Sequence, residues 1–200
     1  MKAAGNYILV YIEQKLKNEI ELKNGKSLYL NPDYNPFEYR TVSGSVHSVP
    51  EKFNDVFEKG DKVYFHHTVV IGKASVIDSS SKIFRVQYVR PEKAFVSYDC
   101  AIYLIERDGE KHTTNKFIFV EPIEEEKHEK IGSLYVPQTA NSTEPFRGVI
   151  RYSNDSVKKE LGVDIGDTIV WQKDSEYAME IDGKIMYRMQ ADNILAQNVG

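Results

Sequence analysis

Cysteine is almost absent from this chain, which has one, Cys100, among 200 residues. A single thiol cannot form an intrachain disulfide or a multi-thiolate metal site, so packing must stabilise the fold, and a reducing compartment suits it. Long apolar runs are also missing. No segment approaches the roughly 18 apolar residues of a membrane-spanning helix, and the apolar run at 7–12 is shorter than a signal-peptide core. We expect a cytoplasmic protein with no membrane partner.

An excess of positive charge is missing as well. The chain has 26 Lys and Arg against 30 Asp and Glu, a formal net charge of −4. Nucleic-acid binding requires a basic surface that neutralises phosphates, so we expect no nucleic-acid partner. The hydrophobic fraction of 41% and the charged fraction of 28% are ordinary for a globular protein, which excludes a disordered chain and a coiled coil.

Motifs that carry catalysis are absent too. The chain contains no glycine-rich phosphate loop, no GxSxG and no HExxH. His66-His67 is the only adjacent histidine pair, and consecutive strand residues point to opposite faces, so we expect no shared metal there. The acidic run at 124–126 suits a solvated loop, and Cys100 suits a small buried residue. We therefore expect no enzyme activity, no catalytic residue, no metal and no cofactor bound by this chain.

Residues that favour β-structure are abundant. The chain has 13 Tyr and 9 Phe with many Val and Ile, and these types favour strands. Short apolar runs separated by Gly, Asp, Asn and Pro are typical of a small barrel or sandwich. The best helical stretch is a short one at 153–164, where Ser or Asp can cap the start and Gly162 the end. The pattern predicts an all-β fold.

Four sequence landmarks occur twice in the same order, which indicates an internal duplication. The Gly60-Asp61 turn recurs at Gly166-Asp167, 106 positions later, and a strand-like run follows each. The other three pairs are 7–10 with 117–120, 43–46 with 147–150, and 90–96 with 190–196.

The duplication predicts three segments along the chain. Residues 1–97 form a first barrel, residues 98–114 form a connecting β-hairpin, and residues 115–200 form a second barrel. The hairpin is indicated by two runs of β-formers around Asp108-Gly109. No Gly/Ser-rich or Pro-rich linker separates the halves, so we expect them to pack in a fixed relation.

An apolar triplet interrupts a charged stretch after the first strand of each half. The first is Leu28-Tyr29-Leu30 and the second is Leu134-Tyr135-Val136, and each follows a serine. Long connections in compact domains are usually functional or disordered, and an apolar patch in one suits docking on a partner. One loop alone binds weakly because ordering it costs free energy, but several on one assembly bind well.

The first triplet has a second interpretation that the residues leave open. Residues 20–30 read as an ordinary β-hairpin, in which Asn24-Gly25 suits a type I′ turn between two runs of β-formers. The second half has no Asn-Gly, and the stretch at 124–133 is too polar for a core strand. There the sequence favours an exposed loop.

The second half, from about 115 to 198, resembles the GroES family of co-chaperonins. The resemblance rests on FIFVEP, IGSLYVP, RGVI, VDIGDTIVW and the closing EIDGKIMYRMQADNILA. In that family the flexible loop carries a Gly, an apolar triplet and often a Pro. These positions correspond here to Gly132, Leu134, Tyr135, Val136 and Pro137. The first half resembles the family more loosely, with Leu28, Tyr29 and Leu30 as the triplet.

The resemblance implies a fold and a function. Each half is expected to form a GroES-like, partly open β-barrel with a long mobile loop, and copies of the chain are expected to assemble into a ring. The ring would cap a GroEL-type chaperonin in an ATP-driven cycle, with the triplets docked in a groove of the chaperonin. ATP would be bound by the chaperonin and not by this chain.

One departure from the family concerns the residues before each Gly-Asp turn. The stretches at 47–60 and 152–166 are short for a roof hairpin of the bacterial type. This resembles phage-encoded members, and no transit peptide precedes Asn6, so we expect a bacterial or phage source and action in the cytoplasm, the host's for a phage. A structural or virion assembly protein that reuses the duplicated fold is the alternative. Exposed triplets favour the first hypothesis and buried ones the second.

Overall fold

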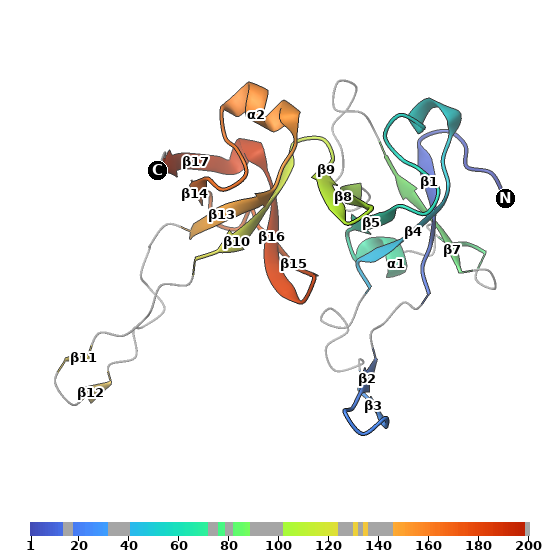
Figure 1. The fold of residues 1–200 in the computed structure, drawn as a ribbon, viewed down its shortest axis with the longest axis horizontal. Helices are drawn as coiled ribbons and strands as arrows, with labels where there is room; N and C mark the ends of the chain where they lie inside the picture. The colour runs from blue at the N-terminus through green and yellow to red at the C-terminus, as the bar shows by residue number, and fades with distance from the viewer. Residues whose placement is uncertain are drawn as a thin grey trace. The chain divides into compact units, whose positions relative to one another are not determined.

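The computed structural model describes residues 1–13, 18–31, 41–71, 76–78, 82–88, 102–123, 130–131, 134–135 and 146–198. The chain divides into two compact units, Met1–Asn115 and Lys116–Gly200 (Figure 1). Each unit is built on one antiparallel sheet, and the strands at the two ends of each sheet are not paired with each other. The all-β expectation is confirmed. None of the helices in the described ranges is long and apolar enough to cross a membrane.

The first unit contains a seven-stranded sheet. Its order is β6 (Val76–Asp78), β7 (Ile83–Gln87), β1 (Tyr7–Tyr11), β4 (Ser43–Ser48), β5 (Lys62–Phe65), β8 (Ile102–Arg107) and β9 (Glu110–Thr113). A 3-10 helix, η1 (Glu51–Phe53), precedes β5, and a short helix, α1 (Thr68–Ile71), follows it. The hairpin around Asp108-Gly109 is formed by β8 and β9, and both of its strands belong to this sheet.

The second unit contains a six-stranded sheet. Its order is β15 (Tyr177–Ile181), β16 (Lys184–Gln190), β10 (Phe117–Pro122), β13 (Phe146–Tyr152), β14 (Thr168–Trp171) and β17 (Ile194–Asn198). Helix α2 (Asp155–Leu161) lies before β14, and η4 (Ala191–Asn193) lies before β17. Two further pairs stand outside the large sheets, β2 (Glu19–Glu21) with β3 (Ser27–Tyr29) and β11 (Lys130–Ile131) with β12 (Leu134–Tyr135).

The two large sheets share their pairing register over the central strands. In the first unit β1 has an irregularity after Leu9, and Val10 then pairs with Val46 of β4. In the second unit β10 has the same irregularity after Phe119, and Val120 then pairs with Ile150. Val10 and Val120 are 110 positions apart, and Val46 and Ile150 are 104 positions apart. These are the offsets of the landmark pairs 7–10 with 117–120 and 43–46 with 147–150. A shared bulge is informative because bulges are specific features that re-aim a strand.

In the first unit the strand beside β5 is β8, which we call the closing strand of that unit. Residues 90–96, which the sequence matches to 190–196, lie outside the described residues. On β5, the place that β17 takes on β14 belongs to β8, since Val63 pairs with Ile105 as Ile169 pairs with Gln197. Each pair also has an irregularity at the same point.

A glycine in each unit lies against the neighbouring strand. A Cβ atom on Gly44 would lie 2.6 Å from the Tyr11 carbonyl oxygen, and one on Gly148 would lie 2.5 Å from that of Glu121. Both are closer than real Cβ contacts, and the obstacle is backbone in each case. Glycine is therefore required at both positions, which explains why the landmarks at 43–46 and 147–150 both contain it.

The two cores use different side chains at equivalent places. In the first unit, Tyr88 meets Phe53 and Phe57 edge to face, at centroid distances of 4.9 and 4.7 Å. Such pairs stabilise a core beyond the area that they bury. The second unit has smaller buried residues at the equivalent positions, Val157, Val163 and Ala191. Its largest buried side chain is Trp171, at the position of Phe65. The units therefore share a backbone plan and not a packing pattern.

The short helix expected at 153–164 is confirmed as α2. Its cap is Asn154, whose side chain accepts hydrogen bonds from the backbone N–H groups of Ser156 and Val157. Gly162 ends the helix in the left-handed region with φ of 71°, as is typical of a C-terminal cap. Val157 faces the core. Asn takes the role that the sequence analysis gave to Ser or Asp, because all three accept this bond.

The side chains of His66 and His67 do not point to opposite faces, as the sequence predicted. Strand β5 ends at Phe65, and the two rings lie close together, with centroids 4.2 Å apart and planes tilted by 37°. The Nδ1 atom of His66 accepts a hydrogen bond from the Thr68 backbone N–H at 3.3 Å, at the start of α1. Within the ranges that the structure describes, no group of three or more His, Cys, Asp or Glu side chains could hold a metal ion.

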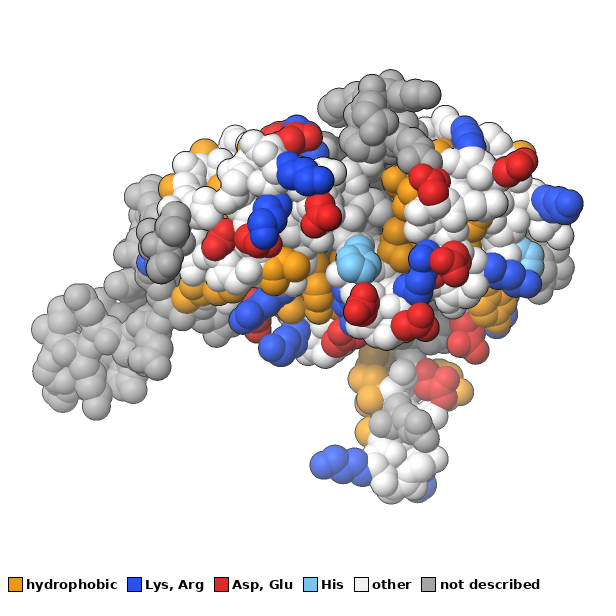
Figure 2. All heavy atoms as spheres, turned by 45° about the horizontal axis from the view of Figure 1, so that its top comes forward, with side chains coloured by type: hydrophobic (Ala, Val, Ile, Leu, Met, Phe, Trp, Pro, Cys, Tyr) orange, Lys and Arg blue, Asp and Glu red, His pale blue; other side chains and the backbone are white. Residues whose placement is uncertain are grey.

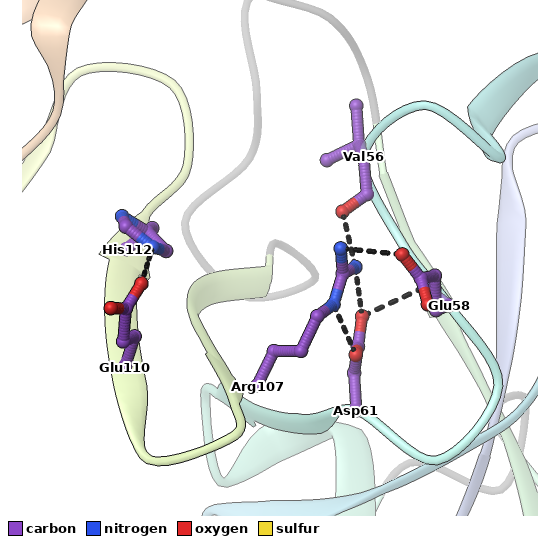
Figure 3. A network of polar contacts seen from close by, with 6 residues as sticks. All are labelled: Val56, Glu58, Asp61, Arg107, Glu110 and His112. Carbon is purple, nitrogen blue, oxygen red and sulfur yellow. Dashed lines mark hydrogen bonds and ion pairs between the residues drawn. The ribbon is translucent and has the colours of Figure 1, made fainter.

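An ion pair ties the closing strand of the first unit to the Gly-Asp turn (Figure 3). Arg107 of β8 donates from Nε and Nη2 to the two carboxylate oxygens of Asp61, each at 2.8 Å. Asp61, which is buried, also accepts from the Glu58 backbone N–H at 2.7 Å. Hydrogen bonding to Asp61 raises the pKa of the Arg107 guanidinium. In the second unit, Gln197 of β17 donates to Asp167 at 2.7 Å.

The Asp61→Ala substitution is expected to destabilise the first unit by about 2 to 3 kcal/mol, because a partly buried guanidinium loses two hydrogen bonds and the Glu58 backbone N–H loses its acceptor. The guanidinium keeps only its contacts to Glu58 and to the Val56 carbonyl. Urea denaturation measures this cost. Asp167→Ala is the matched control, and we expect a loss of only about 1 kcal/mol because its partner Gln197 is neutral. Equal losses for the two variants would contradict this account of the Arg107 pair.

Glu106 of β8 accepts hydrogen bonds from β5 and forms an ion pair with a lysine of β9. Tyr64 Oη donates to it at 2.9 Å, Lys62 Nζ lies at 3.1 Å, and Lys111 Nζ of β9 lies at 3.6 Å. Burial raises the pKa of this carboxyl, but the bonds from Tyr64 and Lys62 and the charges of both lysines outweigh burial, so the pKa is lowered. A lowered folded pKa stabilises the fold above the unfolded value, and that stability is lost as the pH falls through the folded value.

The Glu106→Gln substitution is therefore expected to reduce the loss of stability on acidification. Wild type should lose more free energy of unfolding between pH 6 and pH 3 than the variant does. Chemical denaturation at a series of pH values measures the difference. Identical profiles for Glu106→Gln and wild type would refute the assignment.

Candidate docking site

The first apolar triplet lies on a hairpin that pairs with no other strand of the described residues. In this hairpin Ile20 of β2 pairs with Leu28 of β3, and Glu19 pairs with Tyr29. The Leu30 backbone N–H extends the ladder by donating to the Asn18 carbonyl at 2.8 Å. The hairpin interpretation is confirmed here, but the strands are not part of the seven-stranded sheet (Figure 1).

The turn of this hairpin differs from the expected type I′. The Gly25 N–H donates to the Leu22 carbonyl at 2.9 Å, and the Leu22 N–H donates to the Lys26 carbonyl at 2.7 Å. Gly25 has φ of 73°, whereas Asn24 is not among the residues with positive φ. This is a three-residue loop, a type I turn followed by a left-handed glycine. The Asn24 side chain accepts from the Lys26 N–H at 3.1 Å, so its role is to brace the turn.

Large apolar side chains are exposed on this hairpin (Figure 2). The exposed fractions are 46% for Ile20, 40% for Leu22, 49% for Leu28 and 71% for Tyr29. Strand alternation places Ile20, Leu22 and Leu28 on one face, with Leu30 beyond them, and Tyr29 on the other. We call the residues Ile20, Leu22, Leu28 and Leu30 the apolar hairpin face. Contiguous exposed apolar residues of this kind mark interaction sites.

The second triplet is described in part. Leu134 and Tyr135 form β12, where Leu134 pairs with Ile131 and Tyr135 pairs with Lys130 of β11. Gly132, Val136 and Pro137 lie outside the described residues. Both triplets thus begin on the returning strand of a small hairpin, and in each the first leucine pairs with an isoleucine.

Sequence reasoning identified the triplets but missed their partners on the opposite strand. Ile20 and Leu22 were assigned no role, although they share a face with Leu28, and Ile131 was likewise passed over. The available signal was the two-residue alternation Ile20, Leu22 before the turn. This alternation identifies the partners of the triplet only when the length of the turn is known, because a two-residue loop would pair different residues across the hairpin.

The chain was compared with known proteins, and no family model matches it. It is 33% identical over 85 residues to a protein described as "Co-chaperonin GroES" from Pelobacter propionicus. The match covers 40% of this chain and 87% of that protein. This identity over nearly the whole length of the relative places the chain in the class of co-chaperonins. The chain belongs to the GroES family.

Proposed function

We propose that this chain is a tandem co-chaperonin that caps a GroEL-type chaperonin in an ATP-dependent cycle and assists protein folding. It docks through the triplets at 28–30 and 134–136, and the chaperonin supplies the bound ATP. The observation that carries the proposal is the separate hairpin with its exposed apolar face, which includes Leu28. Family membership supports the class of partner.

The tandem arrangement is supported by the shared register of the two sheets. Val10 pairs with Val46 and Val63 with Ile105 in the first unit, as their equivalents do in the second. The match uses 40% of this chain and covers 87% of the relative, so this chain is long enough for two family units. We place the activity in the cytoplasm, the host's if the source is a phage.

The energetics favour docking through several hairpins at once. Burying a Leu or Ile side chain contributes roughly 1.5 to 3 kcal/mol, so the apolar hairpin face gives a moderate gross gain. Ordering a disordered segment costs about 2 to 5 kcal/mol, and a hairpin already paired along Glu19–Tyr29 and Ile20–Leu28 pays less of this cost. Self-assembly into a ring makes later contacts intramolecular.

Co-sedimentation of the purified chain with a GroEL-type chaperonin tests the proposal. We expect the chain to sediment with the chaperonin when ATP or ADP is present and to stay in the supernatant without nucleotide. Binding to none of the chaperonins tried, including one from the native host, would overturn the proposal. That result would favour the structural or virion assembly protein.

A further inference from the structure

The turn of the first hairpin contains the only Asn-Gly pair in the sequence, Asn24-Gly25. Such a pair is chemically labile, because the backbone nitrogen that follows an asparagine can attack the side-chain amide and close a five-membered ring. Glycine has no Cβ to shield that nitrogen, and a Cβ built on Gly25 would meet nothing within 4 Å. Asn24, Gly25 and Lys26 are all exposed, so water reaches the reacting atoms.

The Asn24 amide is oriented as an electrophile. Its Oδ1 accepts a hydrogen bond from the Lys26 backbone N–H at 3.1 Å, which folds the side chain over the Gly25 peptide unit. When the Gly25 nitrogen attacks Cγ, negative charge develops on Oδ1, and a donor already aimed at that oxygen stabilises it. The bond that braces the turn therefore also favours the first step of ring closure.

A second hydrogen bond of the turn opposes the attack. The Gly25 N–H donates to the Leu22 carbonyl at 2.9 Å, and this nitrogen must release that bond and lose its proton before it reacts. The hairpin pairs with neither large sheet in the described ranges, so its turn can open without unfolding the unit. The bond from Lys26 to Asn24 does not involve Leu22 and can persist in the opened turn. Opening of the turn therefore controls the rate of the reaction.

Asn154 provides a comparison within the same chain. Its Oδ1 accepts from the backbone N–H of Ser156, also two positions further on, at 3.0 Å. The nitrogen that would attack belongs to Asp155, which carries a side chain and begins helix α2. Asn154 therefore has the oriented amide without the unshielded nitrogen, and we expect it to stay intact.

We propose that Asn24 is a site of spontaneous deamidation. The Gly25 nitrogen gives its proton to solvent and bonds to Cγ of Asn24, and the side-chain nitrogen takes up a proton and leaves as ammonia. Water then opens the resulting succinimide. Cleavage of the ring bond to Cγ restores the main chain and leaves aspartate, whereas cleavage of the ring bond to the backbone carbonyl carbon leaves isoaspartate. Either route consumes water and releases ammonia, and nothing is oxidised or reduced.

The two products have different consequences for docking, and this step rests on the proposed function. Aspartate adds a negative charge at the turn but keeps its length. Isoaspartate carries the main chain through the side-chain carbon and so lengthens the turn by one backbone atom. Because the turn sets the register of a hairpin, the pairing of Ile20 with Leu28 is displaced and the apolar hairpin face is disturbed. Isoaspartate formation thus removes the first hairpin from docking as the chain ages.

Ageing the purified full chain at neutral pH, without a chaperonin, tests the modification. Peptide mapping by mass spectrometry follows the exchange of amide for acid, and enzymatic methylation of isoaspartate measures that product. We expect both products to accumulate at Asn24, with many-fold less at Asn154. The matched control Asn24→Gln keeps an amide at this position but cannot close a five-membered ring, so it should stay unmodified. No acid at Asn24, or an equal extent at Asn154, would overturn the proposal.

Partition of the aged chain on a limiting amount of chaperonin tests the consequence. After nucleotide-dependent co-sedimentation, we expect isoaspartate at position 24 to be depleted several-fold from the pellet relative to the supernatant, whereas aspartate there is found in both. Equal isoaspartate in the two fractions would overturn the effect on docking. If the fresh chain fails to sediment with the chaperonin, the proposed function fails, and the ageing experiment still decides the modification.

Discussion

Replacing Leu28 and Leu30 by aspartate is expected to weaken chaperonin binding through the first hairpin by at least about 100-fold. Each leucine contributes roughly 1.5 to 3 kcal/mol when buried, and each aspartate would have to be desolvated without a partner. Fold stability should change little, because Leu28 is exposed and Leu30 half-buried. Nucleotide-dependent co-sedimentation at a series of chaperonin concentrations measures the loss.

A matched control separates loss of apolar contact from added charge. Lys23→Asp lowers the charge at the turn of the same hairpin by two, as the leucine variant does, but leaves the apolar hairpin face intact. We expect this control to bind within a few-fold of wild type. If it loses as much affinity as the leucine variant, then charge on the hairpin, and not apolar docking, governs binding.

The second triplet is tested in the same way by Leu134→Asp with Val136→Asp. We expect chaperonin binding to fail while oligomers persist, because Leu134 and Tyr135 lie outside both large sheets. Comparing this variant with the Leu28/Leu30 variant shows whether both hairpins dock. Intact binding in either one removes that triplet from the docking site.

The Gly148→Ala substitution is expected to destabilise the second unit by about 3 kcal/mol or more. Its Cβ would lie 2.5 Å from the Glu121 carbonyl oxygen and 2.4 Å from Cγ1 of Val120, so the backbone of β10 or β13 would have to move. Trp171 is the chain's one tryptophan and is buried in that unit. Its fluorescence during urea denaturation therefore reports the loss directly.

Two further glycine substitutions serve as comparisons for Gly148→Ala. Gly44→Ala creates the equivalent clash in the first unit, so it should lower stability by circular dichroism and shift the Trp171 transition less. A Cβ on Gly183 meets nothing within 4 Å, although the residue has φ of 77°, so Gly183→Ala should cost only about 1 kcal/mol. A Gly148→Ala transition no lower than that of Gly183→Ala would contradict the close approach of the strands.

The parts of the fold that the sequence predicted are those with local signals. The Gly60-Asp61 and Gly166-Asp167 turns, the strands around Gly44 and Gly148, and the capped helix at 155–161 all carry such signals. The close approach at the two glycines explains why that landmark was reliable.

The closing strand of the first unit could not be located in this way. The place of β8 depends on long-range pairing with β5, which no local pattern encodes. The roles of Ile20 and Leu22 in the docking site were missed for a related reason. Their shared face with Leu28 depends on a three-residue turn, whereas Asn24-Gly25 suggested a two-residue one.

Chaperonin-assisted refolding tests the central claim most directly. A denatured client that refolds only with a GroEL-type chaperonin, ATP and a co-chaperonin is refolded with this chain as the co-chaperonin. We predict that the chain restores the yield and that the Leu134→Asp, Val136→Asp variant does not. No yield above chaperonin and ATP alone, with a chaperonin to which the chain binds, would contradict a folding role.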